Sequence, residues 1–236
     1  MKKTYSDIFI DFDDTLYDTR GNSSIALREV FAQFCLMPHF PNPEVFFDNF
    51  WKINTELWEQ YSQEKITREH LMLQRFLRPL NMGLGLSVSE EFCHEMSDRF
   101  LELCAEKSGV IEGAHELMDY LKGKDYRLHI CSNGFREVQY KKLNACGLHH
   151  YFDTIILSED VGAQKPSKVF YDAALKTAGA KAESTIMIGD NYQNDIVGAM
   201  NAGIDALLFN RWERGFVPPR PVTYIVDELK DIMQIL

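Results

Sequence analysis

The sequence predicts an α/β fold, a doubly wound parallel sheet with an all-helical domain inserted after its first strand. From about Gly109 onward, short apolar runs alternate with longer amphipathic runs. The stretch from about Thr19 to Lys107 shows helical periodicity and no convincing strand. Strands that are short and apolar throughout are typical of a parallel sheet covered by helices on both faces.

The elements of the sheet domain follow one another regularly. Strands are predicted at 8–10, 127–131, 154–157, 185–188, 206–209 and 223–226. Amphipathic runs predict helices at 136–146, 168–178 and 194–201, and a closing helix after the last strand. We therefore expect an α/β core over 1–17 and 108–236, and a helical domain over 18–107.

The inserted segment is predicted to hold four amphipathic helices. They span 22–37, 43–61, 67–77 and 87–107, with Asn22, Thr67 and Ser87 as candidate N-caps. Aromatic residues crowd the second helix at 46, 47, 50, 51, 58 and 61. Because 47, 50, 51, 54 and 58 have helical spacing, we interpret them as a packing face rather than a ligand cage.

Composition restricts the classes of partner. The net charge of −10, without a run of Lys or Arg, disfavours binding to nucleic-acid polymers. Five cysteines with no CxxC pattern indicate reduced thiols rather than a disulfide framework. No apolar run of membrane-spanning length and no signal core is found. We therefore expect a cytoplasmic protein that is a monomer or small homo-oligomer.

A cluster of carboxylates follows the first strand directly. Asp11, Asp13 and Asp14 stand within four residues, and Thr15 comes next. Buried carboxylates are costly unless they are neutralised, and a divalent cation is the usual remedy. Taken alone, the cluster could be an acidic turn.

Other polar residues follow the later strands. Ser132, Asn133 and Gly134 come after 127–131, Asp190 comes after 185–188, and Lys165 lies in the loop beyond 154–157. Ligands of open α/β sheets bind at the carboxyl ends of the strands. Each segment alone is typical of a turn, a loop or a helix cap, but their joint occurrence in this order indicates one site.

Phosphoryl transfer is the chemistry that this combination predicts. Asp11 is the candidate nucleophile, and Asp13 is the candidate general acid and base. Mg²⁺ would be held by Asp11, Asp190 and a main-chain carbonyl near Asp13. The predicted phosphate-binding residues are Thr15, Ser132, Asn133 and Lys165.

These motifs resemble those of the haloacid dehalogenase-like hydrolase superfamily, over 5–17 and from about 110 to 209. The resemblance implies that Asp11 is the nucleophile, Asp13 the acid/base and Asp190 the distal magnesium ligand. It also implies that Ser132 and Lys165 hold the phosphate, that Asp195 orients Lys165 and the waters of the metal, and that the helical insert is a cap.

Within the superfamily, Asp13 disfavours the dehalogenases, which lack a carboxylate two positions after the nucleophile. Residues 12–18, followed by a helical cap of this length, look most like the small-molecule phosphatases, including the pyrimidine 5′-nucleotidases. The resemblance implies hydrolysis of a small phosphomonoester, with a nucleoside 5′-monophosphate as the leading substrate. A phosphosugar mutase and a catalytically silent regulatory protein are the alternatives. Thr19, Arg20 and Asn22 are candidate substrate contacts, and Asp14 is expected to serve the backbone of the turn.

Overall fold

A computed structural model describes residues 4–212 and 215–236 of the chain. The chain divides into two compact units. One comprises Met1–Thr19 with Ser108–Leu236 and contains the sheet, and the other comprises Arg20–Lys107 and is helical. No helix within 4–212 or 215–236 is long and apolar enough to cross a membrane.

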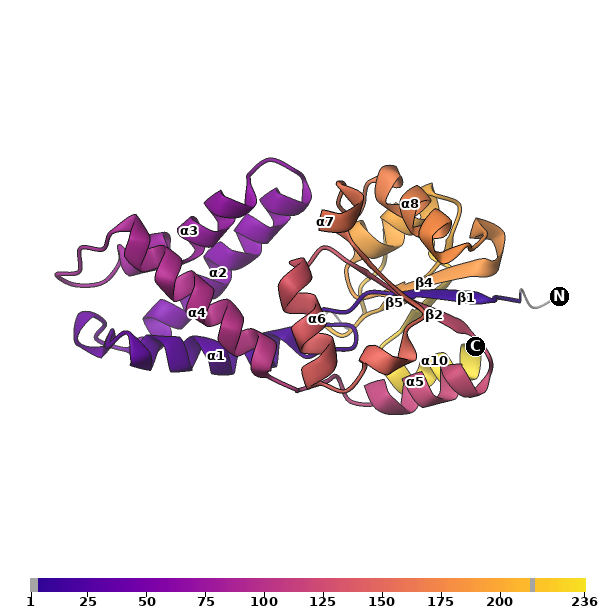
Figure 1. Ribbon diagram of the computed structural model, residues 1–236, viewed down its shortest axis with the longest axis horizontal. Coiled ribbons are helices and arrows are strands. Elements are labelled where there is room, and N and C mark those ends of the chain that lie inside the picture. Colours follow the sequence, from indigo (N-terminus) through magenta and orange to yellow (C-terminus); the bar gives the residue numbers. More distant parts are fainter. Residues whose placement is uncertain (1–3, 213–214) are drawn as a thin grey trace. The chain divides into compact units, whose positions relative to one another are not determined.

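The sheet has six strands in the order β3-β2-β1-β4-β5-β6, and every pairing is parallel. Its strands are β1 Asp7–Ile10, β2 Arg127–Ser132, β3 Thr154–Leu157, β4 Thr185–Gly189, β5 Asp205–Phe209 and β6 Tyr224–Val226. The chain builds outward from β1 through β2 to β3, and then crosses to β4 on the other side of β1. Figure 1 shows the sheet with the helices around it. The doubly wound prediction is confirmed, and the strand order reverses at β1, where such folds bind ligands.

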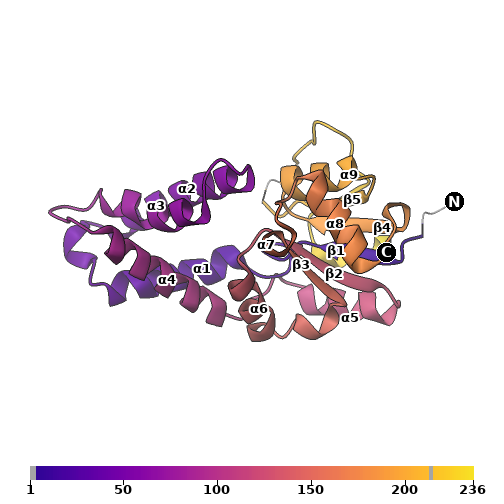
Figure 2. The same ribbon diagram turned by 45° about the horizontal axis from the view of Figure 1, so that its top comes forward.

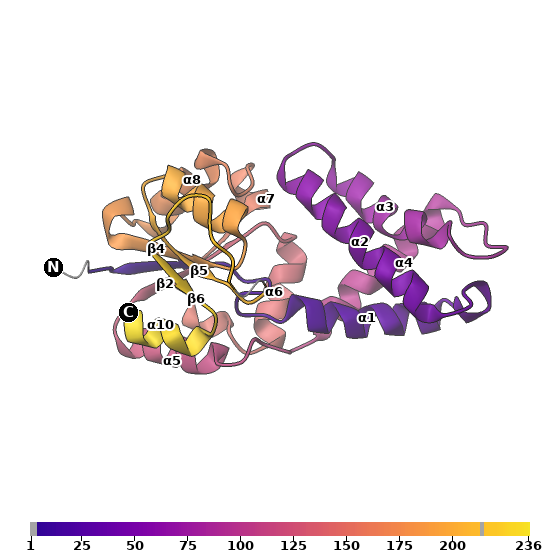
Figure 3. The ribbon, with the colours of Figure 1, turned by 180° about the vertical axis from the view of Figure 1, so that it is seen from behind.

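Helices cover both faces of the sheet. They are α5 Ala114–Gly123, α6 Arg136–Ala145, α7 Ser158–Val161, α8 Lys168–Ala178, α9 Gly198–Asn201 and α10 Leu229–Ile235. Shorter turns are the 3₁₀ segments η2 His149–Tyr151 and η3 Ala182–Ser184, and the π-helix η4 Tyr192–Val197. In Figures 1 and 3, α8 lies on one face, and α5 and α10 lie on the other. Figure 2 shows α9 on the same side as α8.

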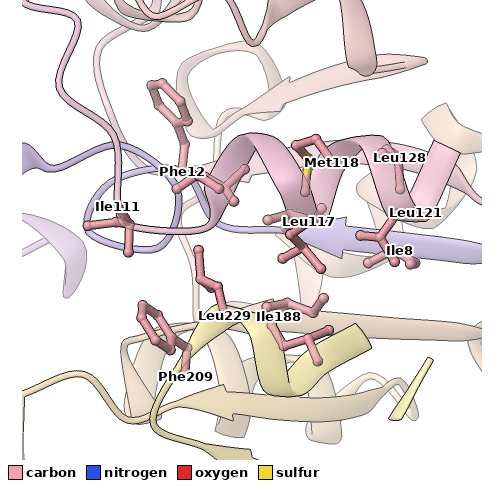
Figure 4. Packing of buried hydrophobic residues seen from close by; sticks show 14 of the residues in the cluster. Ile8, Phe12, Ile111, Leu117, Met118, Leu121, Leu128, Ile188, Phe209 and Leu229 are labelled. Carbon is pink, nitrogen blue, oxygen red and sulfur yellow. The ribbon is translucent and has the colours of Figure 1, made fainter. Parts of the chain in front are cut away.

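The central strands β1 and β4 bury both of their faces, as their apolar sequences predict. Ile8 and Ile10 pack with residues of α5 and α10, such as Leu117 and Leu229 (Figure 4), while Phe9 packs with Phe170 of α8 and its neighbours. Successive side chains of a strand point to opposite faces, so one strand contributes to two cores. This burial fixes the positions of the strand ends, where the polar residues stand.

Two features of this unit differ from the sequence prediction. Helices α5 and α7 were not predicted, and the predicted helix at 194–201 is the π-helix η4 followed by the short helix α9. The hydroxyl of Tyr171 lies 2.8 Å from the carbonyl oxygen of Asn194 and 3.0 Å from that of Asp195. These carbonyls are thus drawn to a tertiary partner, which favours the wider turn over a regular α-helix.

The helical unit contains α1 Thr19–Gln33, α2 Pro43–Ser62, α3 Arg68–Leu80 and α4 Glu90–Glu106, with the 3₁₀ turn η1 Met37–His39. Aromatic side chains fill its core. Phe50 is fully buried, and its ring centroid lies 5.1 Å from that of Phe76 and 5.3 Å from that of Phe100. Phe47 and Phe50 therefore belong to a packing face, as their spacing predicted.

The caps of these helices correct two predictions. Thr67 does cap α3, accepting a hydrogen bond from the backbone N–H of His70 at 3.2 Å. Ser89, not Ser87, caps α4, because Val88 packs into the hydrophobic core directly before the cap and fixes where the helix begins. Asn22 is not a cap either, since α1 begins at Thr19 and Asn22 is buried inside the helix.

Candidate active site

Strands β1 and β4 are neighbours, and their ends bring two carboxylates together. Ile10 pairs with Ile188, so Asp11 and Asp190 follow at the same edge of the sheet. Asp195, from the π-helix, completes the group, and carboxylate oxygens of the three residues lie within 4.8 Å of one another. The hydroxyl of Thr15 donates to Asp11 Oδ2 at 3.0 Å. It also accepts from the backbone N–H of Asp190 at 3.1 Å, which ties both strand ends together.

Lys165 lies beneath this carboxylate group and is 2 % exposed. Its Nζ donates to Asp11 Oδ1 at 2.6 Å, to Asp195 Oδ1 at 2.7 Å and to the carbonyl oxygen of Cys131 at 2.7 Å. All three ammonium hydrogens therefore have acceptors. The side-chain amide of Asn133 makes two hydrogen bonds with the Lys165 backbone, at 3.0 and 2.9 Å. The loop that carries the lysine is thereby fixed to the end of β2.

Asp195 is held on both sides. Oδ1 accepts from Lys165, and Oδ2 accepts from the backbone N–H of Asn191 at 3.0 Å. A Cβ atom at Gly189 would lie 2.3 Å from Asp195 Oδ2, so a glycine is needed where β4 ends. With one hydrogen bond at each oxygen, Asp195 is suited to holding Lys165 in place.

The charges of this group do not balance. Lys165 supplies one positive charge against the three carboxylates of Asp11, Asp190 and Asp195. Burial raises the pKa of Asp11 from 3.8 to about 7, helped by the charge of Asp195 and opposed by Lys165. Burial and the charges of Asp11 and Asp195 also raise the pKa of Asp190 well above its usual range. Hard oxygen donors with excess negative charge fit a divalent cation such as Mg²⁺.

Stability should therefore depend on pH and Mg²⁺ together. The folded-state pKa of Asp11 exceeds its unfolded value, so the metal-free protein should lose stability as pH rises from about 4 to 7. Mg²⁺ competes with protons for these carboxylates, so it should raise the melting temperature more at about pH 8 than at about pH 5. Thermal unfolding with EDTA or with excess Mg²⁺ at each pH tests this. An Mg²⁺ shift that is equal at both pH values would contradict it.

Asp13 stands apart from this group and has its own partners. Its Oδ1 accepts from Thr19 Oγ1 and Lys142 Nζ, both at 2.7 Å. Its Oδ2 accepts from Gln139 Nε2 at 2.5 Å. Burial alone would raise the pKa of Asp13, but the charge and hydrogen bond of Lys142, with those of Thr19 and Gln139, hold it below its usual range.

Sequence reasoning missed Gln139 and Lys142. Both lie on α6 and are buried, at 1 % and 7 % exposure. Their spacing of three residues puts them on the same face of the helix as its apolar positions Val138 and Leu143. A glutamine and a lysine at core-facing positions were the available signal.

Ser132, at the end of β2, is left with a hydrogen to donate. Its Oγ accepts from the backbone N–H of Gly134 at 3.0 Å and from Gln139 Nε2 at 2.6 Å. Both lone pairs are therefore used, and within residues 4–212 and 215–236 no acceptor for the hydroxyl hydrogen is found. A Cβ atom at Gly134 would lie 2.2 Å from Gln139 Nε2, so glycine is required here for the glutamine to reach Ser132.

The remaining sequence-predicted residues are distributed over the two units. Thr19 is in the sheet unit, whereas Arg20 and Asn22 are in the helical unit. The Arg20 guanidinium lies 3.7 Å from the centroid of the Trp51 ring. Substrate contacts of Arg20 and Asn22 stay a prediction. Asp14 has φ 63°, and its backbone N–H donates to the carbonyl oxygen of Tyr17 at 2.8 Å. A role of its side chain in the turn stays a prediction.

Sequence reasoning also missed the loop after β5. The indole Nε1 of Trp212 donates to Asp190 Oδ2 at 3.2 Å, and the side chain is 56 % exposed. The Arg211 guanidinium forms ion pairs with two carboxylates. Its nitrogens lie 3.0 Å from Asp18 Oδ1 and 3.6 Å from Asp14 Oδ1. This loop follows β5, the neighbour of β4 in the sheet, and so reaches the acidic cluster from residues that are distant in the sequence.

Comparison with known proteins extends these observations. The family profile described as haloacid dehalogenase-like hydrolase matches residues 8–209. The chain is 30 % identical to the pyrimidine 5′-nucleotidase PynA of Streptococcus pneumoniae over 233 residues, 98 % of this chain and 95 % of that protein. It is 29 % identical to the glyceraldehyde 3-phosphate phosphatase of Methanothermobacter thermautotrophicus over 237 residues, 97 % of this chain and 98 % of that one.

Among solved structures, the putative HAD-hydrolase YfnB from Bacillus subtilis, bound to magnesium, has a TM-score of 0.87 and 29 % identity, and the match covers 99 % of each chain. The similarity therefore extends over both units of this chain. The relatives at about 30 % identity are named for different phosphorylated compounds.

Proposed function

The chain belongs to the haloacid dehalogenase-like hydrolase family and is a phosphomonoester hydrolase, and from this premise we propose that it hydrolyses nucleoside 5′-monophosphates through a phosphoryl-Asp11 intermediate. The observation that carries the mechanism is the pair of carboxylates Asp11 and Asp13, two residues apart, and the similarity to two pyrimidine 5′-nucleotidases supports the substrate class. Asp11 is held by Lys165 and Thr15, and Asp13 is held separately by residues of α6 and by Thr19. Two carboxylates with separate partners suit separate roles as nucleophile and acid/base.

In this proposal each residue has a defined task. Asp11 attacks phosphorus, and Asp13 protonates the departing oxygen and later takes a proton from the attacking water. Lys165 would hold a phosphoryl oxygen by turning the N–H that now donates to Asp11 toward it, the Ser132 hydroxyl would hold another, and Thr15 contacts the phosphoryl group and aligns Asp11. Both polar atoms of the Asn133 side chain form hydrogen bonds with the Lys165 backbone. We therefore assign the phosphate contact of Asn133 to its main-chain N–H.

The donor set also supports a magnesium site. Asp11, Asp190 and the main-chain carbonyl of Asp13 would hold Mg²⁺, with Asp195 placing Lys165 beside them. When bound, the ion would offset the repulsion between Asp11 and the dianionic phosphoryl group.

A substrate panel tests the proposal. Phosphate release should be measured with excess Mg²⁺ and with EDTA, using pyrimidine and purine 5′-monophosphates, glyceraldehyde 3-phosphate and hexose phosphates. We expect Mg²⁺-dependent release, and a kcat/KM for pyrimidine monophosphates about tenfold or more above that for the other esters. A sugar phosphate turned over faster than every nucleotide would contradict the substrate assignment. Conversion of a hexose phosphate into an isomer would instead identify a mutase.

A further inference from the structure

Helix α6 reaches the candidate acid/base with two side chains. Lys142 Nζ lies 2.7 Å from Asp13 Oδ1, and Gln139 Nε2 lies 2.5 Å from Asp13 Oδ2. The same Nε2 lies 2.6 Å from Ser132 Oγ. Gln139 therefore links the acid/base to a residue of the proposed phosphate site, and one helix controls the positions of both.

The two oxygens of Asp13 are not equivalent. Oδ1 accepts two hydrogen bonds, from Lys142 and Thr19, which occupy both of its lone-pair directions. From the part of the chain that the structure describes, Oδ2 accepts one hydrogen bond, from Gln139, which leaves its other lone-pair direction for a ligand. The contacts thus leave Oδ2 as the oxygen that can carry or accept a proton.

The Lys142–Asp13 pair is not an ordinary surface ion pair. The Lys142 side chain is 9 % exposed, and its Nζ also lies 5.0 Å from the centroid of the buried Tyr17 ring. Burying an ammonium is costly, and a surface position would have avoided that cost. A hydrogen-bonding task at Asp13 accounts for the burial.

We propose that Lys142 and Gln139 are positioning residues that fix Asp13 with Oδ2 directed at the leaving oxygen of the substrate. This inference rests on the proposed function. In the first step the bond from Asp11 to phosphorus forms, the bond from phosphorus to the leaving oxygen breaks, and a proton moves from Oδ2 of protonated Asp13 to that oxygen; the lowered pKa of Asp13 makes this protonated form the minor one. In the second step Oδ2 takes a proton from water as the water oxygen bonds to phosphorus and Asp11 is released.

The benefit of fixing Asp13 should depend on the leaving group. An alkoxide is a poor leaving group and needs the proton as it departs, whereas p-nitrophenolate departs without one. The ratio kcat/KM covers only the steps up to departure of the leaving group, so a slow second step does not obscure it. The matched substrates are therefore an alkyl phosphomonoester, such as a nucleotide, and p-nitrophenyl phosphate.

The test compares Lys142→Met and Gln139→Leu with the wild type on both substrates. We expect kcat/KM to fall about 10²-fold to 10³-fold for the alkyl ester and less than about tenfold for p-nitrophenyl phosphate. Lys142→Arg, which keeps the charge and donors, should restore most of the alkyl activity. Lys141→Met removes a neighbouring exposed charge from the same helix. It should leave kcat/KM unchanged for both substrates.

Equal losses on both substrates in folded Lys142→Met and Gln139→Leu variants, or no loss on either, would overturn the positioning role. Should Lys142→Met not fold, Gln139→Leu alone gives the same comparison between the two substrates. Failure of the proposed function has a different signature. Wild-type protein would then release no phosphate from either substrate, or Asp11→Asn would retain full activity.

Discussion

Asp11→Asn is expected to lower the rate of phosphate release by about 10⁴-fold or more, because an amide oxygen cannot form the phosphoryl-enzyme. Asparagine keeps the shape of the side chain and an oxygen that can accept from Lys165 Nζ. The loss should therefore be chemical rather than structural. The measurement is phosphate release under saturating Mg²⁺ with the best ester of the panel. Mass spectrometry of acid-quenched protein should show the phosphoryl adduct in the wild type and not in the variant.

A stability readout separates this loss from misfolding. Asp11→Asn removes one of three crowded carboxylates, so without Mg²⁺ its melting temperature should equal or exceed that of the wild type. Its stabilisation by Mg²⁺ should be smaller. Asp172→Asn, on the exposed face of α8, is the matched control and should leave both readouts unchanged. Full turnover by a folded Asp11→Asn protein would show that another residue is the nucleophile.

Lys165→Met is expected to lower the free energy of unfolding by about 3–5 kcal/mol without Mg²⁺, as breaking a buried ion pair typically does. It leaves Asp11 and Asp195 without their shared cation and the carbonyl of Cys131 without a donor. Phosphate release should fall about 10³-fold, because a charge next to the transferring group is lost. Urea denaturation in EDTA and steady-state kinetics with Mg²⁺ measure the two effects.

The stability loss of Lys165→Met should grow as pH rises. Without the ammonium, the folded-state pKa of Asp11 should rise further above its unfolded value, so the variant loses stability as pH rises. The free energy of unfolding of Lys165→Met should therefore fall further below that of the wild type at about pH 8 than at about pH 5. Lys168→Met is the control, since Lys168 pairs with Asp172 on the surface, where such pairs contribute less than about 1 kcal/mol. If Lys165→Met and Lys168→Met lowered the free energy of unfolding by similar amounts, Lys165 would not be the cation on which the site depends.

Much of the fold could be predicted because burial leaves a clear pattern in the sequence. Strands β1 and β4 are buried on both faces, so their sequences are largely apolar. Their polar ends therefore stand out. The start of α4 and the π-helix η4 could not be predicted, because the core contact of Val88 and the hydroxyl of Tyr171 decided them. Local propensity carries no record of such tertiary partners.

The sequence by itself determined the α/β class, the helical insert and the order of Asp11, Ser132, Lys165 and Asp190, since each of these follows from hydrophobic periodicity and strand ends. Only the tertiary structure decided which groups touch. It placed Lys165 between Asp11 and Asp195, and it brought two side chains of α6 to Asp13 across more than 120 residues of chain. These contacts depend on how the loops and helices pack against the sheet. Hydrophobic periodicity along the sequence does not determine that packing.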